Sequence, residues 1–217
     1  EQDVSELLLN VVALKGHETR EHCLRVQGYA CLLAKTMGVD GSELAHISTG
    51  ALLHDIGNLG IPDAILLKAG PLDHAQWRIV RRHVEVGAEL LKGMQGLEGP
   101  RQLVLEHHER WDGSGYPQGL SGHEISLGAR IFAVADTVET LLSPRPWRKA
   151  WPLPEVVAEI HRGSGTLFDA QVVAAFDEID STQWVKIRAQ FPDKVWETKA
   201  TAPLAVPIPT DLNSAKN

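Results

Sequence analysis

The chain has 217 residues, of which 43% are hydrophobic, and its formal net charge is −7. This length suffices for one large domain with a buried core, and the acidic balance excludes a basic surface that would collect long nucleic acids. We find no signal peptide and no apolar run long enough to cross a bilayer, so no membrane insertion of this segment is expected.

Helical periodicity dominates the chain, and no segment alternates as a strand would. The predicted helices cover residues 4–14, 18–37, 41–56, 73–94, 97–109, 126–142, 153–162 and 169–189. Residues 110–125 are rich in glycine and lack periodicity, which predicts a loop. We expect an all-α helical bundle of about seven to eight helices. The domain is expected at 1–197 with its core at 18–176, and a Pro-containing flexible tail at 198–217.

The two cysteines, Cys23 and Cys31, fall eight residues apart on one predicted helix. That spacing separates them by about 12 Å along the helix axis, which is too far for a disulfide. A chain without a disulfide framework or a metal-type cysteine pair fits a reducing compartment. We therefore expect a cytoplasmic protein.

Two adjacent imidazoles, His107 and His108, run directly into a glycine-rich turn. Gly113 and Gly115 permit backbone conformations closed to other residues, and Pro117 fixes its own φ. Tyr116, between them, is thereby held in place. Because a packed core has little use for consecutive histidines, this segment predicts a binding site.

Other histidines and carboxylates occur in settings that favour metal ligation. Glu18 and His22 stand four apart on one helix face, although such a pair taken alone is more often solvent-facing. Asp55 and Asp136 interrupt apolar stretches, where a carboxylate is costly to bury unless it is paired or bound to metal. The full candidate set is Glu18, His22, His54, Asp55, His83, His107, His108 and Asp136.

This set mixes imidazoles with carboxylates and contains no thiolate. It is too large for one tetrahedral zinc site and suits two or three divalent ions of higher coordination number, with iron or manganese favoured. A carboxylate such as Asp55 can bridge two ions. Taken alone, His54 would pass for a core histidine and His83 for an exposed one.

The ordered motifs resemble the HD-GYP family, a branch of the HD phosphohydrolase superfamily. The resemblance is carried first by His54-Asp55-Ile56-Gly57, His107-His108-Glu109 and Gly115-Tyr116-Pro117. Further matches in family order are His22-x-x-Arg25-Val26, Ile61-Pro62-Asp63, Lys68-Ala69-Gly70, His83-x-x-x-Gly87, Asp136, Arg145-Pro146-Trp147-Arg148 and Phe168-Asp169.

The resemblance implies an HD-domain-like catalytic domain that hydrolyses cyclic di-GMP to pGpG, with GMP as an alternative end product. In such a site a hydroxide that bridges two metal ions attacks the phosphorus. A glutamate at position 18 resembles the three-metal subgroup. His54, Asp55 and Asn58 would be catalytic. The family commonly has lysine at the position of Asn58, and because asparagine keeps a hydrogen-bond donor but loses the charge, it predicts a slower chemical step.

The resemblance also implies substrate-binding positions. Arg145 and Arg148 match positions that contact phosphate, a task that suits the planar arginine fork; the alternative is a solvated basic loop. Tyr116 and Gly115 match the loop beside the ligand, where Tyr116 either contacts substrate or braces the loop. Glu139 stands where the family usually has aspartate. The remaining arginines at 78, 81 and 82 are interpreted as a charged helix face.

Other functions stay open. The substrate could instead be 3′,3′-cyclic GMP-AMP, which presents the same phosphodiester. A catalytically weak module could bind the dinucleotide or a GGDEF-domain partner, and general nucleotide phosphohydrolase activity is a third alternative. An upstream sensory or receiver domain is also expected.

Overall fold

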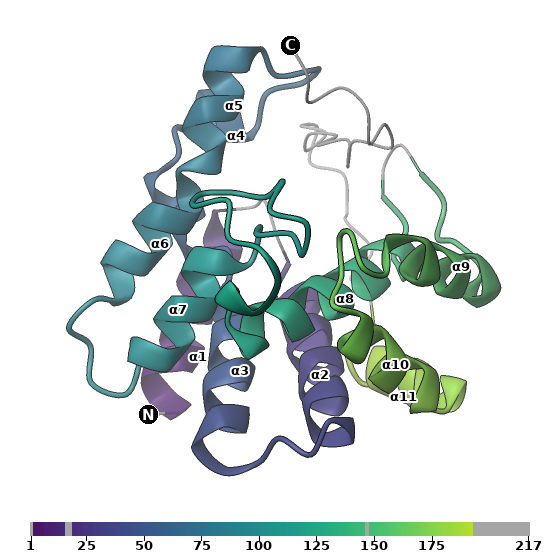
Figure 1. Cartoon of the computed structure of the whole chain (residues 1–217). Helices are drawn as coiled ribbons and strands as arrows, with labels where there is room; N and C mark the ends of the chain where they lie inside the picture. Colours follow the sequence, from purple (N-terminus) through teal and green to yellow (C-terminus); the bar gives the residue numbers. More distant parts are fainter. Residues whose placement is uncertain (1, 16–18, 146–147, 193–217) are drawn as a thin grey trace.

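The described residues of the computed structural model, 2–15, 19–145 and 148–192, form helices joined by loops, without a β-strand (Figure 1). This confirms the predicted all-α fold class. The elements are α1 (Gln2–Leu14), α2 (Arg20–Thr36), α3 (Gly41–Leu53), η1 (Ile56–Gly60), α4 (Asp63–Leu66), α5 (His74–Arg81), α6 (His83–Leu91), α7 (Glu98–Glu106), η2 (Gly122–Glu124), α8 (Leu127–Leu142), α9 (Leu153–Gly163), α10 (Ala170–Glu178) and α11 (Ser181–Gln190).

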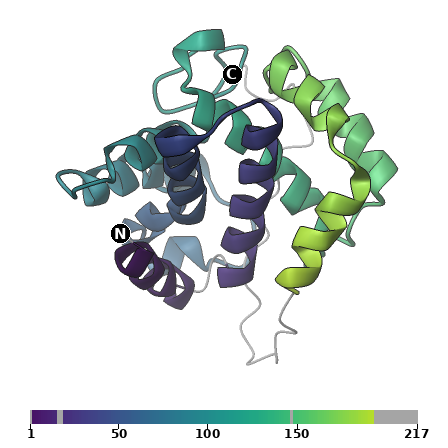
Figure 2. The ribbon, with the colours of Figure 1, turned by 90° about the horizontal axis from the view of Figure 1, so that it is seen from below.

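Two hydrophobic cores hold the helices together. The main core joins α2, α3 and α8 to the C-terminal helices α9, α10 and α11, and contains Phe132 and Trp184. The second core joins α1 to the end of α3, to η1 and to α6 and α7, and contains Leu9 and Leu53. Seen from below, α1 and α11 lie at opposite edges of the molecule (Figure 2). Helices α2, α3 and α8 therefore occupy the middle, where both cores meet.

Several helix boundaries differ from the prediction: the predicted helix 97–109 ends at Glu106, before the paired histidines, and α4, η1 and η2 were not predicted. The predicted helix 73–94 is divided at Arg82 into α5 and α6, and the predicted helix 169–189 is divided near Asp180 into α10 and α11. The third predicted helix ends at Leu53, before η1 begins. At the first break the ring of His83 reaches back to the carbonyl of Val80, with 2.7 Å between Nδ1 and O. This local side-chain contact is invisible to hydrophobic periodicity.

Side chains cap the N-termini of several helices. Thr19 Oγ1 accepts from the backbone amide of His22 at 3.1 Å at the start of α2. Asp73 caps α5 in a capping box with Gln76. Within the described residues, no helix is long and apolar enough to cross a membrane. The predicted tail at 198–217 lies outside the described residues.

Candidate metal centre

The structure brings six of the predicted ligands into two groups at the centre of the bundle. The His22 group consists of His22 on α2, His54 at the end of α3 and Asp136 on α8, and the His83 group of His83, His107 and His108. Within each group the candidate ligand atoms lie within 4.8 Å of one another. Most of these side chains are buried, while Asp136 is 34% exposed. Each group thus offers three donors to one ion.

Hydrogen bonds behind the rings fix which nitrogen faces the centre. Nδ1 of His54, His83 and His107 lies 2.9, 2.7 and 2.8 Å from the backbone carbonyl oxygen three residues earlier. A carbonyl only accepts, so each Nδ1 carries the proton and each Nε2 keeps its lone pair. Nε2 of His83 and of His107 are 3.2 Å apart. Two nitrogens at about 2.1 Å from one ion are separated by about 3.0–3.4 Å, so this donor set fits a divalent metal.

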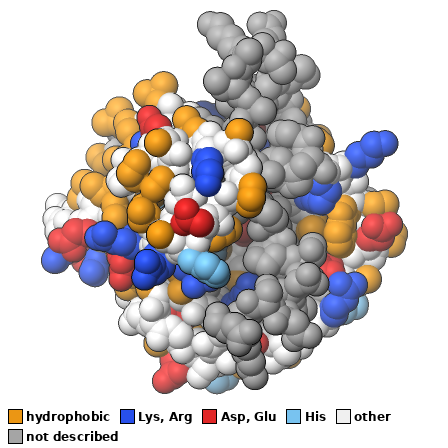
Figure 3. Space-filling model, turned by 90° about the horizontal axis from the view of Figure 1, so that it is seen from above, with side chains coloured by type: hydrophobic (Ala, Val, Ile, Leu, Met, Phe, Trp, Pro, Cys, Tyr) orange, Lys and Arg blue, Asp and Glu red, His pale blue; other side chains and the backbone are white. Residues whose placement is uncertain are grey.

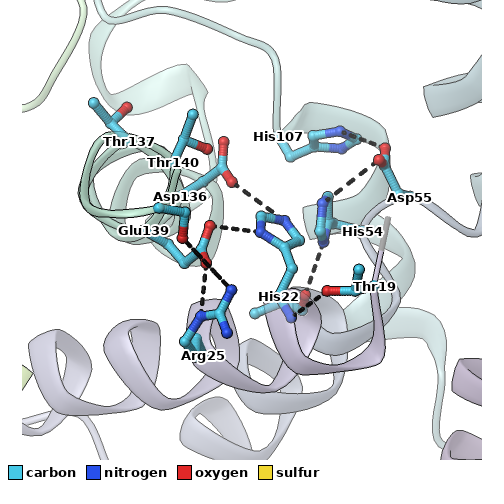
Figure 4. Close-up of polar contacts among 12 residues, drawn as sticks. Thr19, His22, Arg25, His54, Asp55, His107, Asp136, Thr137, Glu139 and Thr140 are labelled. Atoms are coloured by element: carbon cyan, nitrogen blue, oxygen red, sulfur yellow. Dashed lines mark hydrogen bonds and ion pairs between the residues drawn. The ribbon is translucent and has the colours of Figure 1, made fainter. Parts of the chain in front are cut away.

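Asp55 lies between the two groups, with one carboxylate oxygen toward each (Figure 4). Its Oδ2 is 3.8 Å from Nε2 of His54. Its Oδ1 is 3.4 Å from Nε2 of His83 and 3.9 Å from Nε2 of His107. The carboxylate is therefore placed to bind on both sides, as a bridging ligand does.

Two glycines permit this approach. A Cβ atom at Gly57 would lie 1.7 Å from the carbonyl oxygen of His83 and 2.6 Å from the amide nitrogen of Gly87. A side chain at Gly87 would meet Val104 at 2.8 Å. The backbone of η1 therefore packs directly on α6, and this packing places Asp55 next to His83. The glycines of His-Asp-Ile-Gly and His-x-x-x-Gly are thereby explained by close packing.

Burial keeps the imidazoles of His107 and His108 neutral. Burial lowers the pKa of His107 well below its usual value, and the neighbouring rings of His108 and His83 lower it further. Burial also lowers the pKa of His108 to about 3. Because neutral imidazole is the form that binds metal, these two rings are ready for ligation at neutral pH.

Glu139 supports the His22 group from behind (Figure 4). Its side chain is fully buried, and its Oε2 lies 2.6 Å from Nδ1 of His22. Its Oε1 accepts from Nε of Arg25 and from Oγ of Ser143, each at 2.7 Å. Burial alone would raise the pKa of Glu139, but its contacts with His22, Arg25 and Ser143 hold it well below its ordinary value. A carboxylate paired in this way orients the imidazole.

This position corrects the expectation that Glu139 contacts substrate. A side chain without exposed surface does not reach a ligand, and both carboxylate oxygens already accept bonds from the protein. Sequence reasoning placed Glu139 with the substrate contacts because the family usually has aspartate there. Its length instead lets it reach from α8 to α2.

The sequence matches an HD domain family model over residues 5–172. The chain belongs to the HD domain family. The match covers α1 to the first turn of α10 and contains both ligand groups. Membership and the curated relatives together confirm the resemblance to HD-GYP proteins.

Two curated relatives and one solved structure illustrate the family. The cyclic di-GMP phosphodiesterase response regulator RpfG of Xanthomonas campestris is 38% identical over 81% of this chain and 47% of its own length. The 3'3'-cGAMP-specific phosphodiesterase 2 of Vibrio cholerae is 36% identical over 86% of this chain and 36% of its own length. The V. cholerae cyclic GMP-AMP specific phosphodiesterase V-cGAP3 shares the fold, with a TM-score of 0.60 and 19% identity over 92% of this chain and 55% of that one. The HD domain thus spans about half or less of the length of these curated relatives.

The Gly-Tyr-Pro loop of this HD domain closes over the His83 group. The ring of Tyr116 stacks on His108 with 4.8 Å between centroids, and its amide donates to the carbonyl of His108 at 3.2 Å. Gly113 has a φ of 78°, as expected for a turn glycine. Gly115 is required for another reason, because a Cβ there would lie 2.4 Å from the amide nitrogen of Arg110. Tyr116 therefore forms a wall of the site.

Glu109 anchors the same loop, a role that sequence reasoning missed. Its buried carboxylate accepts from the backbone amides of Gln118, Gly119 and Leu120 at 2.7, 3.2 and 3.1 Å. The sequence offered one signal for this role, namely that Glu109 directly follows the paired histidines. The loop is thus held by the residue that follows the ligands.

The other predicted site residues are placed differently. Glu18 and the pair Pro146-Trp147 lie outside the described residues. Asn58 is buried in η1, three residues after Asp55, and its catalytic role remains a prediction. Arg145 is half-buried beside Arg148 and exchanges backbone hydrogen bonds with it.

Arg148 completes the C-terminal end of α8. Its guanidinium donates to the carbonyls of Thr140 and Leu141 at 2.6 and 3.2 Å, where a cation also complements the helix dipole. The phosphate contact expected of Arg148 remains a prediction that competes with this structural role.

Proposed function

We propose that this HD domain is a metal-dependent phosphodiesterase that hydrolyses cyclic di-GMP to pGpG, with GMP as the alternative end product. The observation that carries the proposal is Asp55, whose two oxygens face two separate ligand groups. The names of the curated relatives support the substrate class. The resemblance and the paired groups together favour a two-metal or three-metal site.

Divalent ions in this site would activate a water molecule and neutralise charge on the phosphate oxygens. His22, His54 and Asp136 would hold one ion, and His83, His107 and His108 the other. Asp55 would bind both. Iron and manganese suit this nitrogen and oxygen donor set, and a third ion beside Glu18 is proposed from the sequence.

The protein surroundings prepare the site for an anionic substrate. Burial and the charge of Asp55 raise the pKa of Tyr116 above its ordinary value, so the phenol stays neutral beside the ligands. A neutral phenol donates a hydrogen bond and adds no negative charge. The wall of the site is therefore compatible with a phosphodiester.

3′,3′-Cyclic GMP-AMP is a second candidate substrate, favoured by the relative named for it. Both dinucleotides offer the same phosphodiester and differ in one base, so the ligand groups serve either. A catalytically weak receptor is the alternative from another class, and Asn58 is the residue that favours it. A GGDEF-domain partner and an upstream sensory or receiver domain remain proposals from the sequence.

Product analysis tests the proposal. We expect the protein, loaded anaerobically with Fe(II) or with Mn(II), to convert cyclic di-GMP to pGpG, with chromatography of the products at successive times as the measurement. Cyclic GMP-AMP is tested in parallel to rank the substrates. Binding of both dinucleotides without turnover under each metal would replace the enzyme by the receptor.

Arg81 is a further candidate substrate contact that the sequence interpretation assigned to a charged helix face. Its guanidinium carbon lies 5.0 Å from the ring centroid of Tyr116, and Tyr116 stacks on the ligand His108. Seen from the α4–α5 end, this face of the molecule carries several Lys and Arg side chains (Figure 3). Arg81 is exposed and stands one aromatic ring away from the His83 group, where part of a dinucleotide beyond the reacting phosphate would lie.

We expect Arg81→Ala to raise KM for cyclic di-GMP roughly tenfold, because a charge-assisted contact is lost, with little change in kcat. The matched control is Arg78→Ala, on the same helix and also exposed, which should leave KM unchanged. Turnover of bis(p-nitrophenyl) phosphate, a phosphodiester without any nucleotide, should be equal in both variants. An equal loss on both substrates would instead mean that Arg81 only props Tyr116.

A further inference from the structure

Helix α1 has two apolar faces, and one of them packs in the second core, beside the candidate metal centre. Leu9 and Val12 are buried in the second core. They pack in the cluster that contains Leu53 and Ile56, the residues on either side of His54 and Asp55. The inner face of α1 therefore supports the segment that carries two candidate ligands.

Helix α1 lies at the edge of the molecule (Figure 2). Its outer face carries a second apolar stripe. Val4, Leu7 and Leu14 are 48%, 62% and 86% exposed, and Val11 is half-buried. The steps between these four residues are three, four and three. That spacing places all four on one side of a helix at the heptad period. Contiguous exposed apolar side chains of this kind mark an interaction surface.

We propose that α1 pairs with α1 of a second copy of this chain as a parallel two-stranded coiled coil. Val4 and Val11 occupy the a positions, and Leu7 and Leu14 the d positions. A β-branched residue at a with leucine at d favours the parallel dimer. Because the stripe repeats at the heptad period, it is complementary to itself, as a two-fold symmetric interface requires.

The charge of α1 opposes a membrane surface as the occupant. The helix Gln2–Leu14 contains Asp3 and Glu6 and has neither Lys nor Arg in its sequence. Amphipathic helices that lie on anionic lipid carry basic residues on their polar face. A second copy of α1 thus fits the stripe better than a lipid surface.

Two heptads bury less than a standard stable interface of about 1,200–2,000 Å². We therefore expect a reversible dimer whose population rises with protein concentration. In the dimer the outer face of α1 contacts the partner helix, while its inner face still packs against Leu53 and Ile56. The inference concerns assembly and does not depend on which substrate is hydrolysed.

Sedimentation velocity of the whole chain tests the pairing. We expect a monomer–dimer equilibrium in the wild type and loss of the dimer in Leu7→Asp. The matched control is Val185→Asp on α11, because Val185 is also 62% exposed; this variant should dimerise like the wild type. Circular dichroism melting checks that each variant is folded. A wild type that stays monomeric up to about 1 mM, or equal loss in both variants, overturns the proposal.

Oxidative cross-linking tests the parallel arrangement separately and does not require a disruptive charge. In a Cys31→Ser background, Leu7→Cys should give a covalent dimer, because equivalent d positions face each other across the two-fold axis. Cys23 is buried and stays inert, and Val185→Cys serves as the exposed control. A dimer in sedimentation that Leu7→Cys fails to cross-link, or equal cross-linking through Val185→Cys, overturns the parallel coiled coil.

Discussion

Asp55→Asn is expected to reduce phosphodiester hydrolysis by at least about 10³-fold, the equivalent of several kcal/mol of lost charge stabilisation. The amide keeps one oxygen that can face one ligand group. Its other end is an NH₂ group, which donates and does not bind a cation. The two-sided contact of Asp55 with His54 and His83 is therefore lost.

Metal analysis gives the same prediction a readout that is independent of turnover. We expect the bound metal to fall by about one ion per chain in Asp55→Asn, measured by elemental analysis after dialysis. Asp63→Asn is the matched control, because Asp63 lies eight residues later with its side chain 68% exposed and paired with Lys15. Unchanged metal content and activity in Asp55→Asn would remove Asp55 from the centre.

Glu139→Ala should lower the free energy of unfolding by about 3–5 kcal/mol, because it removes the buried carboxylate that pairs with the buried guanidinium of Arg25. Arg25 is 2% exposed and bonds to Glu139 through Nε at 2.7 Å. The imidazole of His22 loses its orienting carboxylate in the same change. Urea denaturation of the metal-free protein measures the stability term.

The milder Glu139→Gln separates folding from metal binding. The amide keeps the shape of the side chain and an acceptor for Arg25, so more stability should remain, while metal affinity should fall about 10–100-fold. Asp177→Ala is the control, since its pair with His161 is about half exposed; it should change stability by less than about 0.5 kcal/mol. Wild-type metal affinity in Glu139→Gln would show that the carboxylate serves the fold alone.

The helices were largely predictable from the sequence because apolar spacing reports which face of a segment is buried. The breaks at Arg82 and near Asp180 were not predictable in this way. At Arg82 the reason is a side chain that binds a backbone carbonyl three residues earlier, between His83 and Val80. Such a contact leaves the hydrophobic pattern of 73–94 unchanged.

Residue type alone identified the ligand-capable side chains, because histidines and carboxylates inside apolar stretches need a partner. It did not divide them into groups. That division depends on η1 packing against α6, which the absence of a side chain at Gly57 permits. Glu139 was misplaced for a similar reason, since it reaches inward from α8 to His22 on α2. The position of Arg81 over the ring of Tyr116 likewise joins segments distant in sequence.

The sequence by itself determined an all-α protein of the HD type and its ligand-capable residues, since composition, periodicity and motif order are local properties of the chain. Only the tertiary structure decided that Asp55 lies between two groups of three ligands, that Glu139 stands behind His22, and that α1 keeps an apolar face outward. These features are distances between segments far apart in the chain and the solvent exposure of side chains in the folded molecule. They depend on how helices pack, which no local pattern records.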